Sequence, residues 1–315
     1  MIRLIHFSDI HVTAPQLDWE LRDWFNKRYA AWFNYRWLGR GKRFRHADEV
    51  LTRLVNEIVE RKADHIIFSG DATALGFESE IRRAAEMLRV GDPQLPPGLA
   101  VPGNHDYCTR EAAASGLFER YFAPWLAGTR LNGELYPFVQ RVGHLNLIAV
   151  NSSTGNRMAW DASGAVGPLQ RDRLRQLLST LEPGPRILVT HYPICHDNGH
   201  REHRAHGLRD LTEMVQVAAE GGVNLWIHGH RHQPYVLQEP PLAPFPVICV
   251  GSATQTGRWS YNEYAIEGNQ CRVQRRIFNA EKGTFQDGTT FEIQLAGAVP
   301  NTSENEPRIA PISTD

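Results

Sequence analysis

His65-Ile66-Ile67-Phe68-Ser69-Gly70-Asp71 is the stretch that indicates the fold most directly, because an apolar run rich in β-branched residues stops abruptly at a polar cluster. Runs of the same kind recur along the chain, at Leu4–Phe7, Leu99–Val101, Leu145–Val150, Ile187–Thr190 and Val223–Ile227. Short runs bounded by polar residues are typical of buried strands. The sequence therefore predicts a series of buried strands that each end in polar side chains.

Segments with helical spacing lie between these runs. Apolar residues recur at intervals of three and four within Leu51–Ile58, Ile81–Leu88, Leu174–Leu181 and Leu211–Val215, and Pro168 stands where a helix start is expected. Alternating strands and helices predict an α/β layered domain, in which ligands gather in the loops beyond the strand ends.

The pattern changes after Gly229, where strands follow one another without helices. These runs are 234–238, 247–250, 261–266, 271–278 and 284–294, and they predict a second, mostly antiparallel sheet. Asp287-Gly288 is a hairpin-turn signal. We expect one domain over residues 1–295 and a disordered tail over 296–315, where polar residues and proline predominate.

Composition bounds the function. Lysine and arginine number 34 against 35 for aspartate and glutamate, so a net charge of -1 creates no general attraction for nucleic acid or anionic membranes. Cys108, Cys195, Cys249 and Cys271 form no CxxC pair, which favours a reducing compartment. The start of the chain turns polar too early for a signal peptide, and no apolar run is long enough to span a bilayer. We expect a cytoplasmic protein.

Candidate metal ligands stand at five of the predicted strand ends. They are Asp9 and His11, Asp71, Asn104 with His105 and Asp106, His191, and His230 with His232. Each motif alone is weak evidence for a metal site. Together they supply the mixture of oxygen donors and imidazoles that two metal ions with a shared carboxylate need. The i, i+2 spacing of Asp9 with His11 and of His230 with His232 points both side chains the same way if the backbone stays extended.

Taken in order, these motifs resemble the motif set of the calcineurin-like metallophosphoesterase superfamily, over roughly three-quarters of the chain. The resemblance implies an α/β fold, a four-layer αββα sandwich of two mixed sheets with flanking helices. It also implies that Asp9, His11, Asp71 and His232 hold one metal and that Asp71, Asn104, His191 and His230 hold the other. His105 would face a phosphate or leaving-group oxygen, Asp106 would orient its imidazole, and a metal-bridging hydroxide would be the nucleophile.

The resemblance is to the bacterial branch that contains class III cyclic-nucleotide phosphodiesterases and related phosphohydrolases. Mixed ligands of this kind accept Mn, Fe, Zn or Co, and we expect Mn, Fe or both. Many relatives carry an acidic or amide residue shortly after Gly-Asp, whereas this chain continues Asp71-Ala72-Thr73. Thr73 is therefore the candidate to support the ligands from behind.

An aromatic and basic insertion, residues 19–45, follows the Asp9-x-His11 loop directly. It contains Trp19, Trp24, Trp32 and Trp37 among many arginines and lysines. Such a segment packs on the core as a helical hairpin, caps the active site, contacts a membrane surface or a lipid substrate, or stacks nucleobases beside phosphates. The sequence leaves these alternatives open, with core packing slightly favoured for most of the aromatic residues.

The loop Cys195–Gly207 follows His191 and is rich in histidine and arginine, so one or two of its residues could contact a substrate phosphate. His228 matches no ligand position, and we expect it in the core or behind the ligands.

The function that fits best is a metal-dependent phosphodiesterase acting on a small nucleotide-like phosphoester. The alternatives are a membrane-surface pyrophosphatase acting on a nucleotide-linked lipid and a non-catalytic, metal-stabilised interaction scaffold. A nuclease acting on duplex nucleic acid is disfavoured by the near-neutral charge.

Overall fold

Two mixed β-sheets form the centre of the molecule. The computed structural model describes residues 1–295, and the expected tail over 296–315 lies outside the described residues. One sheet has the order β13-β12-β11-β1-β2-β3, and the other has the order β4-β5-β6-β7-β8-β10-β9. The strands are β1 (Ile2–Phe7), β2 (His65–Phe68), β3 (Gly98–Ala100), β4 (Thr129–Arg130), β5 (Phe138–Val142), β6 (Leu145–Ala149), β7 (Arg186–Val189), β8 (Leu225–His228), β9 (Tyr235–Leu237), β10 (Val247–Cys249), β11 (Ser260–Glu267), β12 (Gln270–Asn279) and β13 (Thr284–Gln294).

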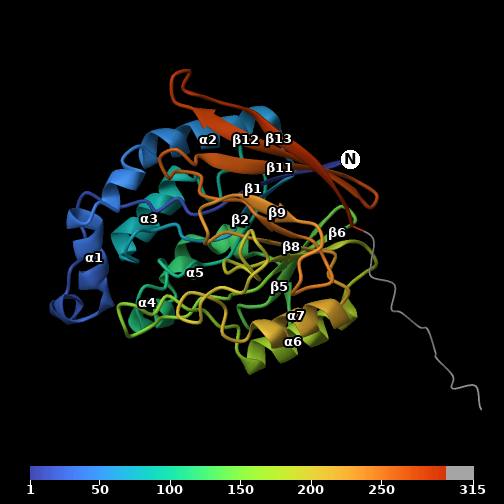
Figure 1. Cartoon of the computed structure of the whole chain (residues 1–315), viewed down its shortest axis with the longest axis horizontal. Coiled ribbons are helices and arrows are strands. Elements are labelled where there is room, and N and C mark those ends of the chain that lie inside the picture. The colour runs from blue at the N-terminus through green and yellow to red at the C-terminus, as the bar shows by residue number, and fades with distance from the viewer. Residues whose placement is uncertain (296–315) are drawn as a thin grey trace, which may run out of the picture.

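Helices cover the outer faces of the two sheets (Figure 1). The α-helices are α1 (Lys27–Trp37), α2 (Ala47–Arg61), α3 (Glu78–Met87), α4 (Arg110–Ala114), α5 (Leu117–Tyr121), α6 (Pro168–Thr180) and α7 (Leu211–Glu220), and short 3-10 helices are η1 (Leu21–Phe25), η2 (Gly41–Phe44) and η3 (Ala123–Leu126). Pro168 occupies the first turn of α6, as its position in the sequence predicts. The six strands expected before Gly229 match observed strands within two residues at each end, whereas β4, β5, α4 and α5 were not predicted.

The four-layer arrangement follows from the alternation of side chains along the strands. In β8, Leu225 and Ile227 pack in the core between the sheets, whereas Trp226 packs in a second core beneath α6 and α7. In β7, Ile187 and Val189 pack in the core between the sheets, whereas Leu188 packs in the second core. A strand buried on both faces needs apolar residues at every position, which is why these strands read as continuous apolar runs. The predicted αββα sandwich of two mixed sheets is confirmed.

The strands after Gly229 do not form a sheet of their own, so that prediction is wrong. β9 and β10 extend the sheet that contains β8, whereas β11 pairs antiparallel with β1 and carries β12 and β13 into the other sheet. Local sequence defines each strand but not its partner, because strand pairing depends on which sheet edge is left uncovered.

The turn predicted at Asp287-Gly288 is also wrong. Both residues lie within β13, and the hairpin to β12 turns between Asn279 and Gly283 instead. The pairing passes from Gln274 opposite Thr290 to Arg276 opposite Asp287, so Gly288 and Thr289 together face one residue of β12. The Asp-Gly pair therefore marks a β-bulge, where an extra residue is accommodated on one strand.

The insertion 19–45 lies at one edge of the molecule, where α1 runs along the side of the sandwich (Figure 1). One face packs on the core, because Trp19, Trp32 and Tyr35 contact a small apolar cluster formed by Ala74, Leu75 and Phe77. None of the α1 residues is fully buried. Across residues 1–295, the structure contains no helix whose length and apolar character would let it cross a membrane.

Candidate metal centre

The predicted ligands meet where two sets of parallel strands end. Asp9 and His11 follow β1, Asp71 follows β2 and Asn104 follows β3, and these three strands are parallel neighbours in one sheet. His191 follows β7 and His230 and His232 follow β8, which are parallel neighbours in the other sheet. Because parallel strands end at the same edge, each sheet gathers its own polar residues there. The face-to-face packing of the sheets brings the two sets together.

Asp9, His11, Asp71 and His232 form the first group, and one ligand atom from each lies within 4.8 Å of the others. Asp9 Oδ1 lies 3.3 Å from His232 Nε2, and His11 Nε2 lies 3.6 Å from Asp71 Oδ2. The two carboxylates are almost completely buried. Burying two acidic groups together is costly unless cations or protons compensate their charge.

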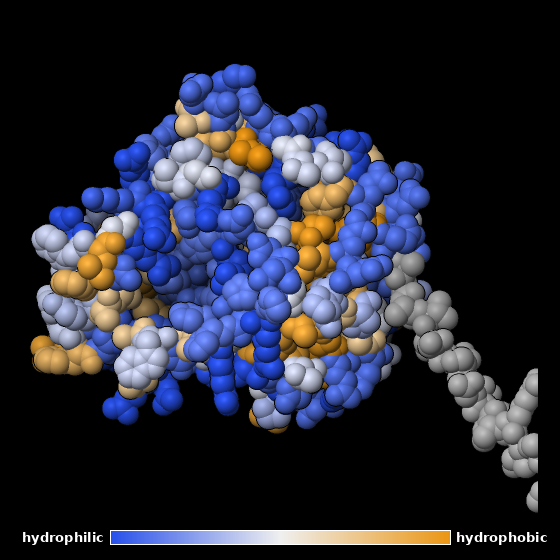
Figure 2. Space-filling model, in the orientation of Figure 1, coloured by the Kyte–Doolittle hydropathy of each residue, from blue (hydrophilic) through white to orange (hydrophobic). Residues whose placement is uncertain are grey.

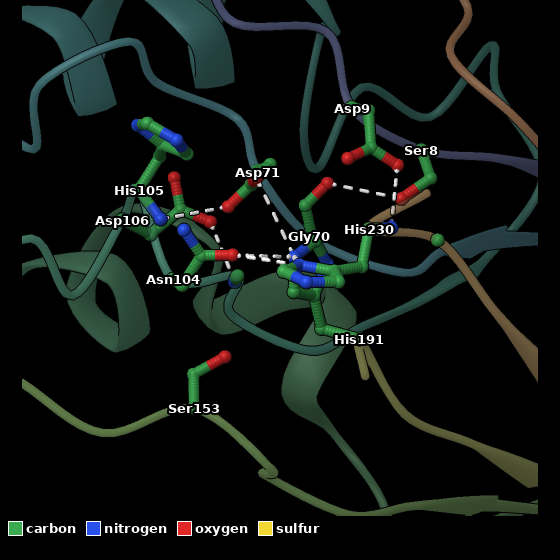
Figure 3. A network of polar contacts seen from close by, with 12 residues as sticks. Ser8, Asp9, Gly70, Asp71, Asn104, His105, Asp106, Ser153, His191 and His230 are labelled. Atoms are coloured by element: carbon green, nitrogen blue, oxygen red, sulfur yellow. Dashed lines mark hydrogen bonds and ion pairs between the residues drawn. The ribbon is translucent and has the colours of Figure 1, made fainter. Parts of the chain in front are cut away.

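Asn104, His191 and His230 form the second group, with Asp71 at its border. The Asn104 amide oxygen lies 2.9 Å from His230 Nδ1 and 3.2 Å from His191 Nε2 (Figure 3). Asp71 Oδ2 lies 3.4 Å from His191 Nε2. The same Asp71 oxygen thus faces a histidine of each group, which is the position of a shared carboxylate.

The outer nitrogen of each of the four imidazoles contacts an oxygen acceptor. His11 Nδ1 donates to the Thr73 carbonyl at 3.2 Å, and His191 Nδ1 donates to the Ser69 carbonyl at 2.8 Å. His230 Nε2 donates to the His206 carbonyl at 3.0 Å, and His232 Nδ1 donates to the side-chain oxygen of Gln255. Such contacts fix the tautomer, so the inner nitrogen of each neutral ring presents a lone pair to the centre.

These residues fit a pair of metal cations. His11 Nε2 and His232 Nε2 lie 3.1 Å apart, and two lone pairs at this distance repel each other unless a positive charge stands between or beside them. Within the part of the chain that the structure describes, Asp9 Oδ1 is buried without a hydrogen-bond partner. Two carboxylates, one amide oxygen and four imidazoles are a donor set suited to Mn, Fe, Zn or Co.

The electrostatics of the second group also favour a positive charge. Burial by itself would lower the pKa of His191, yet the adjacent Asp71 carboxylate raises it to about 9. Burial would raise the pKa of Asp71, but the His191 and His105 imidazoles hold it well below its usual range. A positive charge is therefore stabilised between Asp71 and His191, and a metal ion supplies it as a proton would.

The backbone turns sharply at most of the candidate ligands. Asp9, His11, Asp71, His230 and His232 all have positive φ, between 44° and 68°. The expectation that Asp9 with His11 and His230 with His232 share an extended backbone is therefore wrong. The side chains converge because left-handed residues redirect the chain, at a cost on the order of 1–3 kcal/mol each. Strain gathered at one site is typical of a functional centre.

Glycines make room for these turns. A methyl group at Gly103 would overlap the Asp71 carboxylate and backbone, and one at Gly229 would overlap Ser8 and the Asp9 carboxylate. Gly103 and Gly229 have no positive φ, so close approach and not backbone conformation requires glycine there.

His105 lies at the border of the site, with both ring nitrogens engaged. Its Nδ1 donates to the Ala74 carbonyl at 2.7 Å, and its Nε2 lies 2.6 Å from a guanidinium nitrogen of Arg40. Burial, followed by the Arg40 charge, lowers the pKa of His105 to about 3. Arg40 comes from the insertion 19–45, and nothing in the sequence distinguishes it from its basic neighbours there.

Asp106 does not orient the His105 imidazole, so that part of the prediction is wrong. Its carboxylate accepts hydrogen bonds from the Gly103 and Ala72 amides and from the amide and hydroxyl of Thr73. These contacts tie the loop that carries Asp71 to the loop that carries Asn104. Thr73 acts in this clamp, behind the ligands, as its position after Asp71 suggested.

The loop 195–207 borders the metal centre, whereas His228 lies in the core. His206 lines the pocket over the centre and its carbonyl holds His230, whereas Glu202 of this loop pairs with Arg231. His228 is fully buried, contacts the Tyr235 hydroxyl at 3.1 Å, and has a pKa lowered to about 3 by burial. It belongs to the core.

A pocket of about 700 Å³ opens over the centre. Its lining includes residues of the centre and its border, namely Asp71, Asn104, His105, His230 and His232, and the segment Ala159, Trp160 and Ala162. The residues that α1 and the following turn contribute are Lys27, Ala30, Ala31, Asn34, Leu38 and Arg40. The insertion thus both packs on the core and lines the pocket.

The sequence model of the calcineurin-like phosphoesterases matches residues 2–234, which include every candidate ligand. The chain belongs to the calcineurin-like phosphoesterase family. Members of this family use a dinuclear metal centre, and the donor set described above fits one. A search of curated protein sequences found no significant match.

Solved structures share the calcineurin-like fold. A dimetal phosphatase from Danio rerio is 11% identical, with 94% of this chain and 99% of that chain covered and a TM-score of 0.64. A purple acid phosphatase from yellow lupin (Lupinus luteus) is 11% identical, with 93% and 53% covered and a TM-score of 0.58. PhoD is 8% identical, with 94% and 70% covered and a TM-score of 0.58. At these identities the likeness shows the fold alone.

Proposed function

We propose that this calcineurin-like phosphoesterase is a dinuclear metal-dependent phosphodiesterase acting on a small, nucleotide-like diester. The observation that carries the proposal is the convergence of seven donor side chains in two groups that both border Asp71. In this proposal Asp9, His11, Asp71 and His232 hold one metal, and Asp71, Asn104, His191 and His230 hold the other.

The metals, when bound, supply Lewis-acid activation of phosphate and of water. The protein's own groups do the rest. Arg40 and His105 together face the place where a phosphate oxygen would lie, and the guanidinium stabilises negative charge there. Trp160 and the alanines beside it offer an apolar wall for the organic part of the substrate.

We include the metal identity and the location in the proposal. Manganese, iron or both are the metals we expect; the mixed imidazole and carboxylate ligands accept both, and they accept Zn or Co as well. A cytoplasmic location is supported by the four cysteines, which are all buried free thiols.

The test is hydrolysis of bis-p-nitrophenyl phosphate and p-nitrophenyl phosphate by metal-depleted protein before and after Mn is added back. We expect the diester to be cleaved only with Mn, and Asp71→Ala and Asn104→Ala to lose at least a hundredfold in kcat/KM. Metal analysis should find two ions per chain in the wild type. Preference for the monoester would contradict the diester assignment, and inactivity with Mn, Fe, Zn and Co would favour a binding scaffold.

One observation favours a second candidate, a membrane-surface pyrophosphatase acting on a nucleotide-linked lipid. Apolar side chains are exposed on the insertion, with Phe25 at 85%, Leu38 at 68% and Trp37 at 66% exposure. They belong to the segment that lines the pocket, and Figure 2 shows apolar side chains gathered at the edge where α1 lies in Figure 1.

Vesicle sedimentation distinguishes the two candidates. A lipid-directed enzyme should bind vesicles of phosphatidylglycerol and phosphatidylethanolamine, and Trp37→Ser with Phe25→Ser should weaken that binding at least fivefold. A protein that stays in the supernatant while the vesicles sediment does not bind the lipid surface. That outcome would favour the water-soluble substrate.

A further inference from the structure

A second pocket of about 380 Å³ adjoins the metal centre, and its charge is unusual. Four arginines line it, namely Arg40, Arg43, Arg231 and Arg258, together with Asn34, Leu38, Phe44, His232 and Gln255. Among residues 1–295, no acidic residue belongs to this lining. Arginine clusters without carboxylates are typical of sites that bind phosphate, because the planar guanidinium matches two phosphate oxygens.

Most of this charge is not neutralised by the protein. Arg231 pairs with Glu202, and Arg258 donates to the neutral side chain of Gln233. Within residues 1–295, the side chains of Arg40, Arg43 and Arg258 form no ion pair with a carboxylate. Positive charges brought together beside a metal centre repel one another unless an anion binds among them.

The pocket is constructed by two separate segments that hold each other in place. The Arg43 carbonyl accepts a hydrogen bond from the Thr256 amide at 2.7 Å, which ties η2 of the insertion to the loop that carries Gln255 and Arg258. Phe44 is buried, and its ring lies 4.6 Å from the His11 ring. The arginines therefore stand at a defined position relative to the ligand histidines.

The two pockets share one wall. Arg40, Arg231 and His232 line both, whereas Arg43 and Arg258 line only the second pocket and Asp71, Asn104 and His105 line only the first. A single phosphate bound at the metal centre would leave Arg43 and Arg258 without an anion. Two compartments that meet at His232 suit a molecule with two separate phosphate groups.

We propose that this arginine pocket binds a second phosphate group of the substrate, while the phosphate to be hydrolysed lies over the metal centre. The inference deepens the proposed function and rests on it for the identity of the first site. The substrate is then a small molecule that carries a phosphoester and a further phosphate, with Arg43 and Arg258 as specificity-determining residues.

The test measures binding of phosphonates, which resist hydrolysis, to the metal-loaded full chain by calorimetry. The probes are methylphosphonate and alkane bisphosphonates with linkers of increasing length. We expect at least one bisphosphonate to bind about tenfold or more tightly than methylphosphonate, because charge-assisted hydrogen bonds contribute on this scale. Arg43→Gln and Arg258→Gln should each remove most of this advantage and leave methylphosphonate affinity within about twofold.

Lys42→Gln is the matched control, because Lys42 is an exposed cationic neighbour of Arg43 that lines neither pocket. It should keep the full advantage. Equal affinity of the wild type for methylphosphonate and every bisphosphonate would overturn the proposal, as would an advantage that survives in both arginine variants. A carboxylate-terminated phosphonate that binds as tightly as the bisphosphonate would contradict the assignment to phosphate.

The result is separable from the proposed function. A wild type that hydrolyses no diester but binds a bisphosphonate through Arg43 would disprove the phosphodiesterase assignment and keep the pocket. A wild type that hydrolyses the diester but binds no bisphosphonate more tightly than methylphosphonate would keep the phosphodiesterase assignment and disprove the role of the pocket.

Discussion

Arg40 contributes to the site from outside the motif set. Its guanidinium lies 2.6 Å from His105 Nε2, where it places a permanent positive charge beside the metal ligands. His105 belongs to the Gly-Asn-His-Asp motif, whereas its partner Arg40 comes from the insertion 19–45 and belongs to no motif of the family.

Arg40→Gln is therefore expected to lower kcat/KM for bis-p-nitrophenyl phosphate by roughly a hundredfold, the scale seen when a charge-stabilising donor is removed. Steady-state kinetics with saturating Mn measures this. Arg36→Gln is the control, because Arg36 is exposed on the same segment and stands over Trp37. Equal activity of both variants and the wild type would show that Arg40 plays no part in turnover.

Thr73 stabilises the loops behind the ligands. Its hydroxyl donates to Asp106 Oδ1 at 3.0 Å and accepts from the Gly76 amide at 3.2 Å, all in buried surroundings. Thr73→Val keeps the shape but removes both contacts, so the free energy of unfolding should fall by about 1–3 kcal/mol in urea denaturation. Thr73→Ser retains the hydroxyl and should lose less than half as much; a valine variant as stable as the wild type would contradict the clamp.

Among the helices, α3 carries a buried acid close to its start. Glu80 is fully buried, and its Oε2 accepts hydrogen bonds from the Leu75 amide at 2.9 Å and the Phe77 amide at 3.2 Å. Burial raises the pKa of Glu80 from its ordinary value of 4.5 to about 7. Folding therefore favours the protonated form, and the contribution of Glu80 to stability is full below pH 4.5 and declines as the pH rises towards 7.

Glu80→Gln cannot ionise, and its side-chain oxygen can still accept from both amides. The stability of this variant relative to the wild type should rise between pH 4.5 and pH 7, by up to about 3 kcal/mol. Urea denaturation at several pH values measures the difference, and Glu86→Gln, exposed on the same helix, should follow the wild type. A pH-independent difference between Glu80→Gln and the wild type would show that Glu80 folds in its charged form.

In the whole molecule, the metal centre joins the two sheets. Asp9, His11, Asp71 and Asn104 come from one sheet, and His191, His230 and His232 come from the other. Metal ions that are held by residues of both sheets bind only the folded chain, because the unfolded chain has no preformed site. Their binding therefore stabilises the folded sandwich.

Adding Mn to metal-depleted protein, at about 100 times the dissociation constant, should raise the melting temperature by about 10 °C. His232→Ala and Asn104→Ala should each keep roughly half of this shift, since each serves one group, whereas Asp71→Ala should lose nearly all of it. His200→Ala, in an exposed position of the loop 195–207, should keep the full shift. Loss of the whole shift in Asn104→Ala alone would indicate a single metal.

Local sequence is enough to predict the strands of the sandwich and the candidate ligands. Apolar runs such as His65–Phe68 indicate strands that are buried on both faces, and the polar residues that follow these runs indicate ligands at the strand ends. Both signals lie within a few residues of sequence. Strand partners, the bulge at Gly288 and the left-handed turns at Asp9 and His11 depend on distant contacts. Sequence does not show that Asp106 clamps two loops, that Arg40 reaches the metal centre or that Arg43 lines the adjoining pocket, because packing and not sequence distance brings the insertion against the strand ends.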